Sequence, residues 1–475
     1  MKKTINKTKI VATIGPASSS KEMLEKLIRA GVNVCRVNAS HGKHDDHKVV
    51  IENVREINKK LKQNVAILFD LQGPKLRIGE VKDNKIILED GSLIKLTTEE
   101  VEGTAELLTI RYDSFYKDVH VGDTVLIDDG NIELQVTEKS GNGVVTAKVI
   151  HGGKLSSKKG INLPYTKISL PSLTEKDRSD LEFALENDVE WIGLSFVRSA
   201  TDIIELKNII RERNKFSRVI AKIEKPQAIR DIDKIVRETD ALMVARGDLG
   251  VEIAMEKVPV IQKMLVRKAM KASKPVIIAT QMMESMITNY RPTRAETNDV
   301  ANAVFDGADA LMLSGETSVG AFPEKVVDAM YKIISLSESE ADIYNRLNPP
   351  IKDSVSFISD SICYNSCVMS HQSGARAIIA MTHSGYTAFR ISSQRPEANI
   401  FIFTANRAIL NTLSLVWGVK AIYYDKYEST DHTINDISQY LLQGKFVEKG
   451  DMAIHVFSMP LEDRGMANTI KLNVV

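Results

Sequence analysis

The sequence predicts an α/β protein with a (β/α)8 barrel of the TIM type at its centre, and this prediction depends on eight short apolar runs. Nearly every run ends in a polar or charged residue, and helical patterns separate most of the runs. Such runs are typical of buried parallel strands, and eight of them close a barrel whose chemistry lies at the carboxyl ends of the strands. The runs are Ile10–Ala12, Val32–Cys35, Val65–Phe69, Trp191–Leu194, Val219–Ala221, Ala241–Ala245, Val276–Ala279 and Ala310–Leu313.

The segment between the first two runs predicts a helix. Ser19 and Glu22 have the spacing of a capping box, and Gly31 is a typical residue to end a helix. Between them, apolar residues recur at helical intervals, so we expect one face of the helix to pack on the strands. These residues are Met23, Leu24, Leu27 and Ile28.

The alternation of strand and helix stops for about 120 residues between the third and fourth runs. Strand-like segments are joined there by Gly, Asp and Asn turns. We predict an all-β barrel domain at residues 74–169, inserted into a loop of a catalytic barrel formed by residues 1–73 and 170–346. This insertion lies over the barrel mouth and can act as a lid. The predicted strands are Lys85–Glu89, Ser92–Thr97, Asp123–Ile127, Ile132–Thr137 and Val144–Ile150.

Residues 347–475 are predicted to form an open α/β domain after a linker that begins at Asn348. A helix is expected at Ser354–His371, and Thr469–Val475 is expected as an edge strand. Strand-like runs that alternate with helical patterns are typical of an open α/β sheet. These runs are Ala377–Met381, Ile400–Thr404, Ala421–Tyr424 and Met452–Phe457.

The charge balance argues against nucleic acid and membrane surfaces as partners. The formal net charge is only +1, so the chain has no general basic field. No stretch approaches about 18 uninterrupted apolar residues, and we expect no transmembrane helix. We expect no signal peptide in the first residues. The three cysteines fit a reducing compartment better than a disulfide framework, so we expect a cytoplasmic location.

Lys222 and Glu224 are the sharpest local signal for an active site. Alternate residues of a strand point the same way, so both side chains reach one pocket, unless the strand has already ended and both are solvated. Asp248 follows the neighbouring strand, and two carboxylates are typical of a Mg²⁺ site. At Gly247 an opening helix presents free N–H groups to an anion, although many Gly-Asp pairs are only turns.

Polar residues that follow other strands face the same mouth. The guanidinium of Arg36 can bind phosphate with paired donors, although a loop arginine is more often a surface ion pair. Thr280 ends the seventh strand, where a threonine is common. Asp70, Lys75 and Arg77 lie where the chain enters the insertion, and the alternative for them is a hinge with solvated charges.

A loop of the last domain combines hydroxyl and amide groups at the start of a predicted helix. Such a loop suits a phosphate, and an ordinary Ser/Thr cap explains it equally well. Its residues are Thr382, Ser384, Gly385 and Thr387.

These motifs, in this order, resemble the pyruvate kinase family over essentially the whole chain. The resemblance implies a barrel with a β lid and a carboxyl-terminal regulatory domain. It also implies phosphoryl transfer from phosphoenolpyruvate to ADP, giving pyruvate and ATP in glycolysis. The matching stretches are Thr13-Ile-Gly-Pro-Ala-Ser, Arg36-Val-Asn-Ala-Ser-His-Gly, Gly73-Pro-Lys-Leu-Arg77, Lys158-Lys-Gly-Ile-Asn-Leu-Pro, Ala221-Lys-Ile-Glu, Arg246-Gly-Asp-Leu-Gly-Val-Glu, Ala279-Thr-Gln-Met-Met-Glu-Ser-Met, Asn289-Tyr-Arg-Pro-Thr-Arg-Ala-Glu-Thr-Asn-Asp-Val and Met312-Leu-Ser-Gly-Glu-Thr.

The resemblance implies roles for the matching residues of the catalytic site. Glu224 and Asp248 would bind Mg²⁺ or Mn²⁺. Lys222 would stabilise the charge on the moving phosphoryl group and on the enolate, and Arg36 would hold the phosphate. Backbone amides of Gly247 and Asp248 would hold the substrate carboxylate. Phosphoryl transfer needs mainly positioning and charge neutralisation, which these groups supply.

The resemblance further implies a proton route and a nucleotide site. Thr280 would lie on the route that protonates enolpyruvate, a step that needs a donor on the opposite side of the substrate. The positions that match nucleotide contacts, or lie close to that site, are Asn38, His41, Arg77 and Lys159.

The chain departs from the family pattern at the monovalent-cation site. Many members bind the ion with Asn, Ser, Asp and Thr and carry Glu after Gly-Pro. Here Leu71 replaces the Thr and Lys75 replaces the Glu, while Asn38, Ser40 and Asp70 remain. We expect the Lys75 ammonium to take the cation's electrostatic role, and we expect no requirement for K⁺.

Two further departures concern the metal site and the regulatory domain. Lys225 stands where Asn often follows the Glu, and we expect little effect. Residues 458–469 differ from the usual Gly-rich effector loop, whereas the loop at Ser384–Thr387 is retained. A phosphorylated effector therefore stays a hypothesis, and fructose 1,6-bisphosphate is not expected. The family is usually homotetrameric, and we expect the same here.

Two other functions fit parts of the pattern. One is a metal-dependent aldolase or lyase that acts on an enolpyruvate-like substrate, because barrels host such chemistry. The other is a catalytically dead sensor that binds sugar phosphate through the last domain. Formation of ATP and pyruvate separates pyruvate kinase from both.

Overall fold

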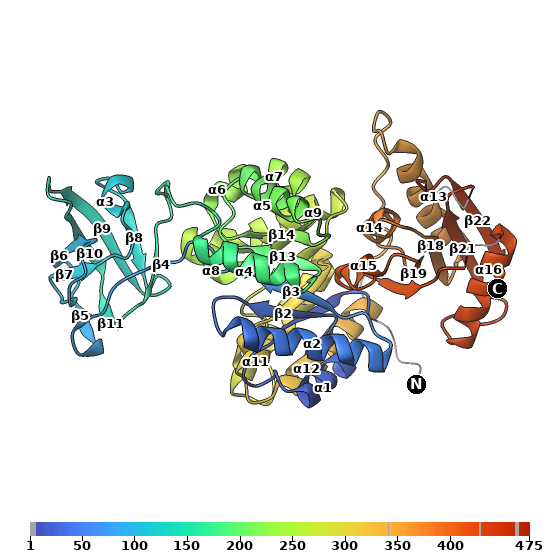
Figure 1. Cartoon of the computed structure of the whole chain (residues 1–475), viewed down its shortest axis with the longest axis horizontal. Helices are drawn as coiled ribbons and strands as arrows, with labels where there is room; N and C mark the ends of the chain where they lie inside the picture. Colours follow the sequence, from blue (N-terminus) through green and yellow to red (C-terminus); the bar gives the residue numbers. More distant parts are fainter. Residues whose placement is uncertain (1–5, 341, 427–428, 461–464) are drawn as a thin grey trace.

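The computed structural model describes residues 6–340, 342–426, 429–460 and 465–475. Figure 1 shows an extended molecule with a barrel at its centre. A β-rich unit lies beyond one end of the barrel, and the unit that contains the carboxyl terminus lies beyond the other end.

The central unit is a closed barrel of eight parallel strands, which confirms the predicted fold class. Each predicted run overlaps one strand, and neighbouring strands in the barrel follow the order β1-β17-β16-β15-β14-β13-β3-β2. The strands are β1 (Lys9–Thr13), β2 (Val34–Asn38), β3 (Ala66–Asp70), β13 (Trp191–Leu194), β14 (Arg218–Ile223), β15 (Ala241–Ala245), β16 (Val276–Ala279) and β17 (Ala310–Leu313).

Helices connect these strands, and the first shows how local sequence sets their bounds. The α1 cap is Ser20, whose side chain accepts a hydrogen bond from the Met23 amide, so the predicted start at Ser19 was wrong by one residue. Gly31 ends α1 at φ 130°, in a region that favours glycine. The barrel helices are α1 (Lys21–Ala30), α2 (His44–Leu61), α4 (Glu175–Glu186), α5 (Ala200–Glu212), α6 (Pro226–Arg230), α7 (Ile232–Glu238), α8 (Arg246–Glu252), α9 (Val258–Lys271), α10 (Arg294–Asp306), α11 (Gly315–Ser318) and α12 (Pro323–Glu340), with 3-10 turns at Met255–Lys257 and Glu284–Ile287.

The lid (residues 74–169) contains a seven-stranded sheet and a two-stranded sheet around its own apolar core. All five predicted lid strands are present, and four shorter strands and a helix were not predicted. The elements are β4 (Leu76–Arg77), β5 (Ile86–Leu88), β6 (Leu93–Thr97), β7 (Leu107–Thr109), α3 (Phe115–Asp118), β8 (Thr124–Ile127), β9 (Ile132–Lys139), β10 (Val145–His151), β11 (Gly153–Leu155) and β12 (Gly160–Asn162), with a 3-10 turn at Lys82–Asn84.

The carboxyl-terminal unit is an open five-stranded sheet in the order β20-β19-β18-β21-β22. Its edge strand β22 pairs antiparallel to β21, while the other pairs are parallel. Of the helices in the described part of the chain, none combines the length and apolar character needed to cross a membrane. The elements are α13 (Phe357–Ser373), β18 (Ala377–Met381), α14 (Tyr386–Ser393), β19 (Asn399–Thr404), α15 (Arg407–Leu410), β20 (Val419–Tyr423), α16 (Thr430–Gln443), β21 (Met452–Phe457) and β22 (Thr469–Val474), with a 3-10 turn at Thr412–Leu415.

Candidate active site

Asp70 lies at the centre of a buried charge cluster at the carboxyl ends of the barrel strands. It is the last residue of β3 and its side chain is 1 % exposed. Arg36 on β2 donates from Nε to Oδ2 of Asp70 at 2.8 Å, and Nζ of Lys222 on β14 lies 3.2 Å from Oδ1. Burial alone raises the pKa of Asp70, but the two cations outweigh it and hold that pKa below its usual value. Asp70 is therefore a fixed anion.

Lys222 is held between acidic groups inside the barrel mouth. β14 continues to Ile223, so the strand has not ended at this lysine. Nζ lies 3.0 Å from Oε1 of Glu224 and donates to Oγ of Ser195 at 2.7 Å. Burial lowers the pKa of Lys222, yet Asp70 and Glu224 raise it above the ordinary lysine value. The side chain therefore places a permanent positive charge at the mouth.

Glu224 and Asp248 form a pair of neighbouring carboxylates. Oε2 of Glu224 accepts a hydrogen bond from the Phe196 amide at 2.6 Å. Burial raises the pKa of Glu224, and the charge of Asp248 raises it further against the opposing effect of Lys222. The charge of Lys222 thus does not fully offset the burial of Glu224 and the charge of Asp248. Such a carboxylate pair is suited to a divalent cation.

The residues present fit a Mg²⁺ or Mn²⁺ ion held partly by the substrate. Within the described ranges, no group of three or more His, Cys, Asp or Glu side chains could hold a metal. Mg²⁺ usually keeps several waters and takes one or two protein carboxylates together with substrate phosphate oxygens. Glu224 and Asp248 match that donor set.

Thr280 lies against the start of α8 in a strained backbone conformation. Its φ is 68°, which is unusual for a β-branched residue. Its Oγ1 accepts a hydrogen bond from the Gly247 amide at 2.7 Å and donates to the Ala279 carbonyl at 2.6 Å. Arg246 donates to the Thr280 carbonyl and pairs with Asp299. These contacts fix the hydroxyl beside the first turn of α8.

The predicted nucleotide residues fall into two groups. Arg77 and Lys159 lie on or beside the paired strands β4 and β12 of the lid. Arg77 donates to the Lys158 carbonyl at 2.9 Å, and Lys159 pairs with Asp128 at 2.7 Å. Asn38 and His41 lie on the barrel side. Among described residues, no hydrogen bond or ion pair joins the two groups.

Asn38 and Asp70 of the expected monovalent-cation site lie side by side, because they pair in register between β2 and β3. Oδ1 of Asn38 accepts from the Ser40 amide at 3.2 Å, and the side chain of Leu71 is buried. Lys75 is exposed, and no ion pair joins it to Asp70 in the described part of the chain. Arg36 and Lys222, rather than Lys75, neutralise Asp70.

Two hydroxyl side chains of the loop before α14 accept hydrogen bonds from backbone amides of the same loop. Oγ1 of Thr382 accepts from the Gly385 amide and Oγ of Ser384 from the Tyr386 amide. Thr387 is buried, and the Ser384 carbonyl accepts from Arg218 at 3.1 Å. The N-cap residue of α14 is Gly385, which makes no side-chain cap hydrogen bond, so this loop is not an ordinary Ser/Thr cap. Of the divergent tail at residues 458–469, residues 461–464 lie outside the described residues.

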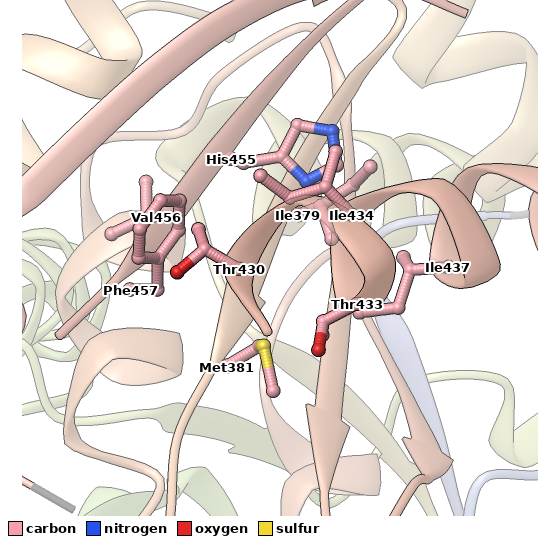
Figure 2. Close-up of a pocket in the computed structure, with 9 residues that line it drawn as sticks. All are labelled: Ile379, Met381, Thr430, Thr433, Ile434, Ile437, His455, Val456 and Phe457. Carbon is pink, nitrogen blue, oxygen red and sulfur yellow. The ribbon is translucent and has the colours of Figure 1, made fainter. Parts of the chain in front are cut away.

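Cavity size does not locate the active site. A cleft of about 1640 Å³ lies between the amino ends of barrel strands, near Lys9 and Asn33, and the carboxyl-terminal unit, near Arg376. Figure 2 shows a second cavity, beside His455 and Thr433, whose volume of about 10 Å³ suits no metabolite. The convergence of charges at the opposite end of the barrel identifies the site instead.

Two further residues of the cluster received no role from the sequence. Ser195 bridges the Lys222 ammonium and the Leu71 carbonyl, to which it donates at 2.6 Å. Thr13 accepts from Nη1 of Arg36 at 3.0 Å and donates to the Leu313 carbonyl. Both residues end barrel strands or follow them directly. This position at a strand end is the sequence feature that could have identified them as site residues.

Comparisons with known proteins place the chain in a family. The family model "Pyruvate kinase, barrel domain" matches residues 5–327, and "Pyruvate kinase, alpha/beta domain" matches residues 360–473. A pyruvate kinase of Staphylococcus epidermidis is 40 % identical over 472 residues, which are 99 % of this chain and 81 % of that protein. One from Staphylococcus aureus is 42 % identical with the same coverage.

A solved structure extends the similarity to three dimensions. The crystal structure of a pyruvate kinase from Cryptosporidium parvum matches with a TM-score of 0.92 and 36 % identity. The match covers 99 % of this chain and 96 % of that chain. The chain therefore belongs to the pyruvate kinase family and is a phosphotransferase.

Proposed function

We propose that the barrel mouth transfers the phosphoryl group of phosphoenolpyruvate to ADP and that the transfer depends on Mg²⁺. The observation that supports this most strongly is the buried cluster of Lys222, Asp70 and Glu224 beside Asp248. A structural core rarely buries several charged groups side by side without a function, because their desolvation is costly. Besides the fixed anion Asp70, the cluster offers the fixed cation Lys222 and the carboxylate pair Glu224 and Asp248, which suits a substrate that carries both phosphate and carboxylate.

Glu224 and Asp248 would hold the divalent cation, Mg²⁺ or Mn²⁺. When bound, the ion neutralises charge on the phosphoryl group and on the enolate oxygen. Arg36 would bind the phosphate with the N–H groups that its contacts to Thr13 and Asp70 leave free. Lys222 supplies the second positive charge from its own strand.

The amides at the start of α8 would hold the substrate carboxylate. The Gly247 amide donates to Thr280, so the substrate and this hydroxyl are close neighbours. Thr280 would pass a proton toward the methylene carbon of enolpyruvate, with water behind it. Arg77 and Lys159 of the lid, with Asn38 and His41 of the barrel, would contact ADP and ATP.

The enzyme would need no K⁺. Leu71 has a buried apolar side chain at the position where many family members have a hydroxyl ligand. Arg36 and Lys222 already neutralise Asp70. The exposed Lys75 adds positive charge at the lid crossing. The carboxylate that would otherwise bind K⁺ is thus already balanced by two protein cations.

The enzyme would act in glycolysis in the cytoplasm, as a homotetramer, with a phosphorylated effector at Thr382, Ser384, Gly385 and Thr387. Light scattering coupled to size exclusion tests the assembly, and a panel of sugar phosphates tests the effector. Fructose 1,6-bisphosphate is expected to have no effect.

A coupled assay with phosphoenolpyruvate and ADP tests the activity. We expect pyruvate and ATP in equal amounts, with loss of activity in chelator. Pyruvate without ATP would favour a lyase. Binding of sugar phosphate without turnover would favour a sensor.

A further inference from the structure

Lys225 forms a buried ion pair directly behind the metal site. It follows Glu224 in the chain, and its side chain is 10 % exposed. Its ammonium pairs with Oε1 of Glu252 and lies 5.6 Å from the centre of the Phe196 ring. The same Phe196 donates its amide to Glu224. Lys225 is therefore packed against the residue that orients a proposed metal ligand.

Glu252 is the last residue of α8, and its side chain is fully buried. Besides Lys225, its Oε1 accepts a hydrogen bond from Nδ2 of Asn162 at 2.8 Å. Its Oε2 is buried and has no hydrogen-bond partner among described residues. The negative charge of Glu252 is thus balanced by one ammonium and one amide, which come from different parts of the fold.

The three side chains join three elements that the reaction uses. Lys225 directly follows Glu224 at the end of β14. Glu252 ends the seven-residue helix α8, whose first turn contains Asp248. Asn162 ends β12 of the lid, one strand from the proposed nucleotide residue Arg77.

Both chain crossings into the lid meet this region. At the first crossing, Gly73 has φ 69°, and a Cβ there would lie 2.9 Å from the Phe196 ring. Before the second crossing, Asn162 at the end of the last lid strand contacts Glu252. A Cβ on Gly130 of the lid would also lie 3.8 Å from Val251 of α8. The lid is therefore seated on the last turn of the helix that begins at the metal site.

We propose that Asn162, Glu252 and Lys225 are positioning residues that couple the orientation of the lid to the placement of the metal carboxylates. The inference rests on the proposed phosphoryl transfer at Glu224 and Asp248. The ion pair between Lys225 and Glu252 ties β14 to α8, so Glu224 and Asp248 keep their separation. The hydrogen bond from Asn162 then fixes the lid, with its nucleotide residues, against the same helix. Lys225 thus has a larger role than the small effect expected from the sequence.

The test uses Lys225→Asn, Glu252→Gln and Asn162→Ala in the full chain. Controls are Arg213→Ala, which removes an exposed ion pair with Glu182, and Asn142→Ala, which alters an exposed lid turn. Electron paramagnetic resonance measures Mn²⁺ affinity without substrates. Steady-state kinetics measures the KM for ADP, and calorimetry measures Tm.

Lys225→Asn and Glu252→Gln are expected to weaken Mn²⁺ binding about 10-fold, in the range found for residues that orient metal ligands. Asn162→Ala is expected to raise the KM for ADP more than it changes kcat. The double variant Asn162→Ala with Lys225→Asn should raise that KM by less than the product of the single effects, because both act through Glu252.

The proposal is overturned if Lys225→Asn lowers Tm but leaves Mn²⁺ affinity and the KM for ADP as in the controls. It is also overturned if the two single effects multiply fully. If Glu252→Gln fails to fold, Lys225→Asn and Asn162→Ala still test the proposal. Absence of kinase activity in the wild type would contradict the proposed function. The coupling is tested separately, because Mn²⁺ binding is measured without turnover.

Discussion

The Lys222 ammonium lies 3.0 Å from Oε1 of Glu224, two residues further along the chain, and 3.2 Å from Oδ1 of Asp70 on β3. One cation is thus shared by two buried carboxylates from different strands. This sharing keeps the lysine charged and leaves the second oxygens of the carboxylates to other partners.

Lys222→Met is expected to lower kcat about 10³-fold, because it removes the positive charge that opposes the charge of the transition state. Lys222→Arg keeps that charge and should recover part of the loss. Initial rates of ATP formation measure both, with circular dichroism to confirm folding. A loss below tenfold in folded Lys222→Met would remove this lysine from the proposed mechanism.

Thr280→Val is expected to slow protonation of enolpyruvate about 10²-fold, since it replaces the hydroxyl by a methyl group of similar size. Thr280→Ser keeps the hydroxyl and serves as the control. Deuterium exchange at the methyl group of pyruvate, followed by proton NMR, isolates this step from phosphoryl transfer. Equal exchange rates in Thr280→Val and wild type would exclude the hydroxyl from the proton route.

The rate of the wild type is expected to be the same with Na⁺ or K⁺ as the only monovalent cation. Lys75→Glu should leave this independence unchanged, because Lys75 is exposed and Asp70 is neutralised by Arg36 and Lys222. Initial rates across a series of KCl concentrations at constant ionic strength measure the dependence. A wild type active only with K⁺ contradicts the proposal.

His455 is expected to lower stability in acid. It lies on β21 next to Ile379 and Ile434 (Figure 2), and burial lowers its pKa to about 4. The unfolded chain takes up the proton near pH 6.5, so unfolding is favoured progressively as the pH falls from about 6.5 to about 4, by about 3 kcal/mol in full. Above pH 7 the group has no such effect.

His455→Asn removes this proton uptake. Calorimetry at a series of pH values is expected to show a smaller fall in Tm below pH 6.5 for the variant than for the wild type. Parallel curves for the two proteins would show that His455 does not titrate in this way.

Strong local patterns made most of the fold predictable. Uninterrupted apolar runs located all eight barrel strands, and the polar residue at each run's end located the cluster around Asp70 and Lys222. Very short strands such as β4 and β12 were missed, because two or three residues carry no periodicity. These strands form because the rest of the lid brings β4 and β8 beside β12.

Contacts between distant segments were harder to predict than strands. The sequence shows Lys225 beside Glu224 but does not show that Glu252 and Asn162 approach it from another helix and from the lid. Likewise, the position of the Lys75 ammonium depends on the path of the chain into the lid, which the sequence does not show. In the structure the Lys75 side chain is exposed. Such contacts arise from tertiary geometry and not from local propensity.

Phosphorus NMR of the wild type with phosphoenolpyruvate, ADP and Mg²⁺ tests the central claim most directly. The account predicts that the phosphoenolpyruvate signal falls as the γ-phosphate signal of ATP rises, and that excess chelator stops both changes. Release of inorganic phosphate in place of ATP, or full transfer in the presence of chelator, would contradict it.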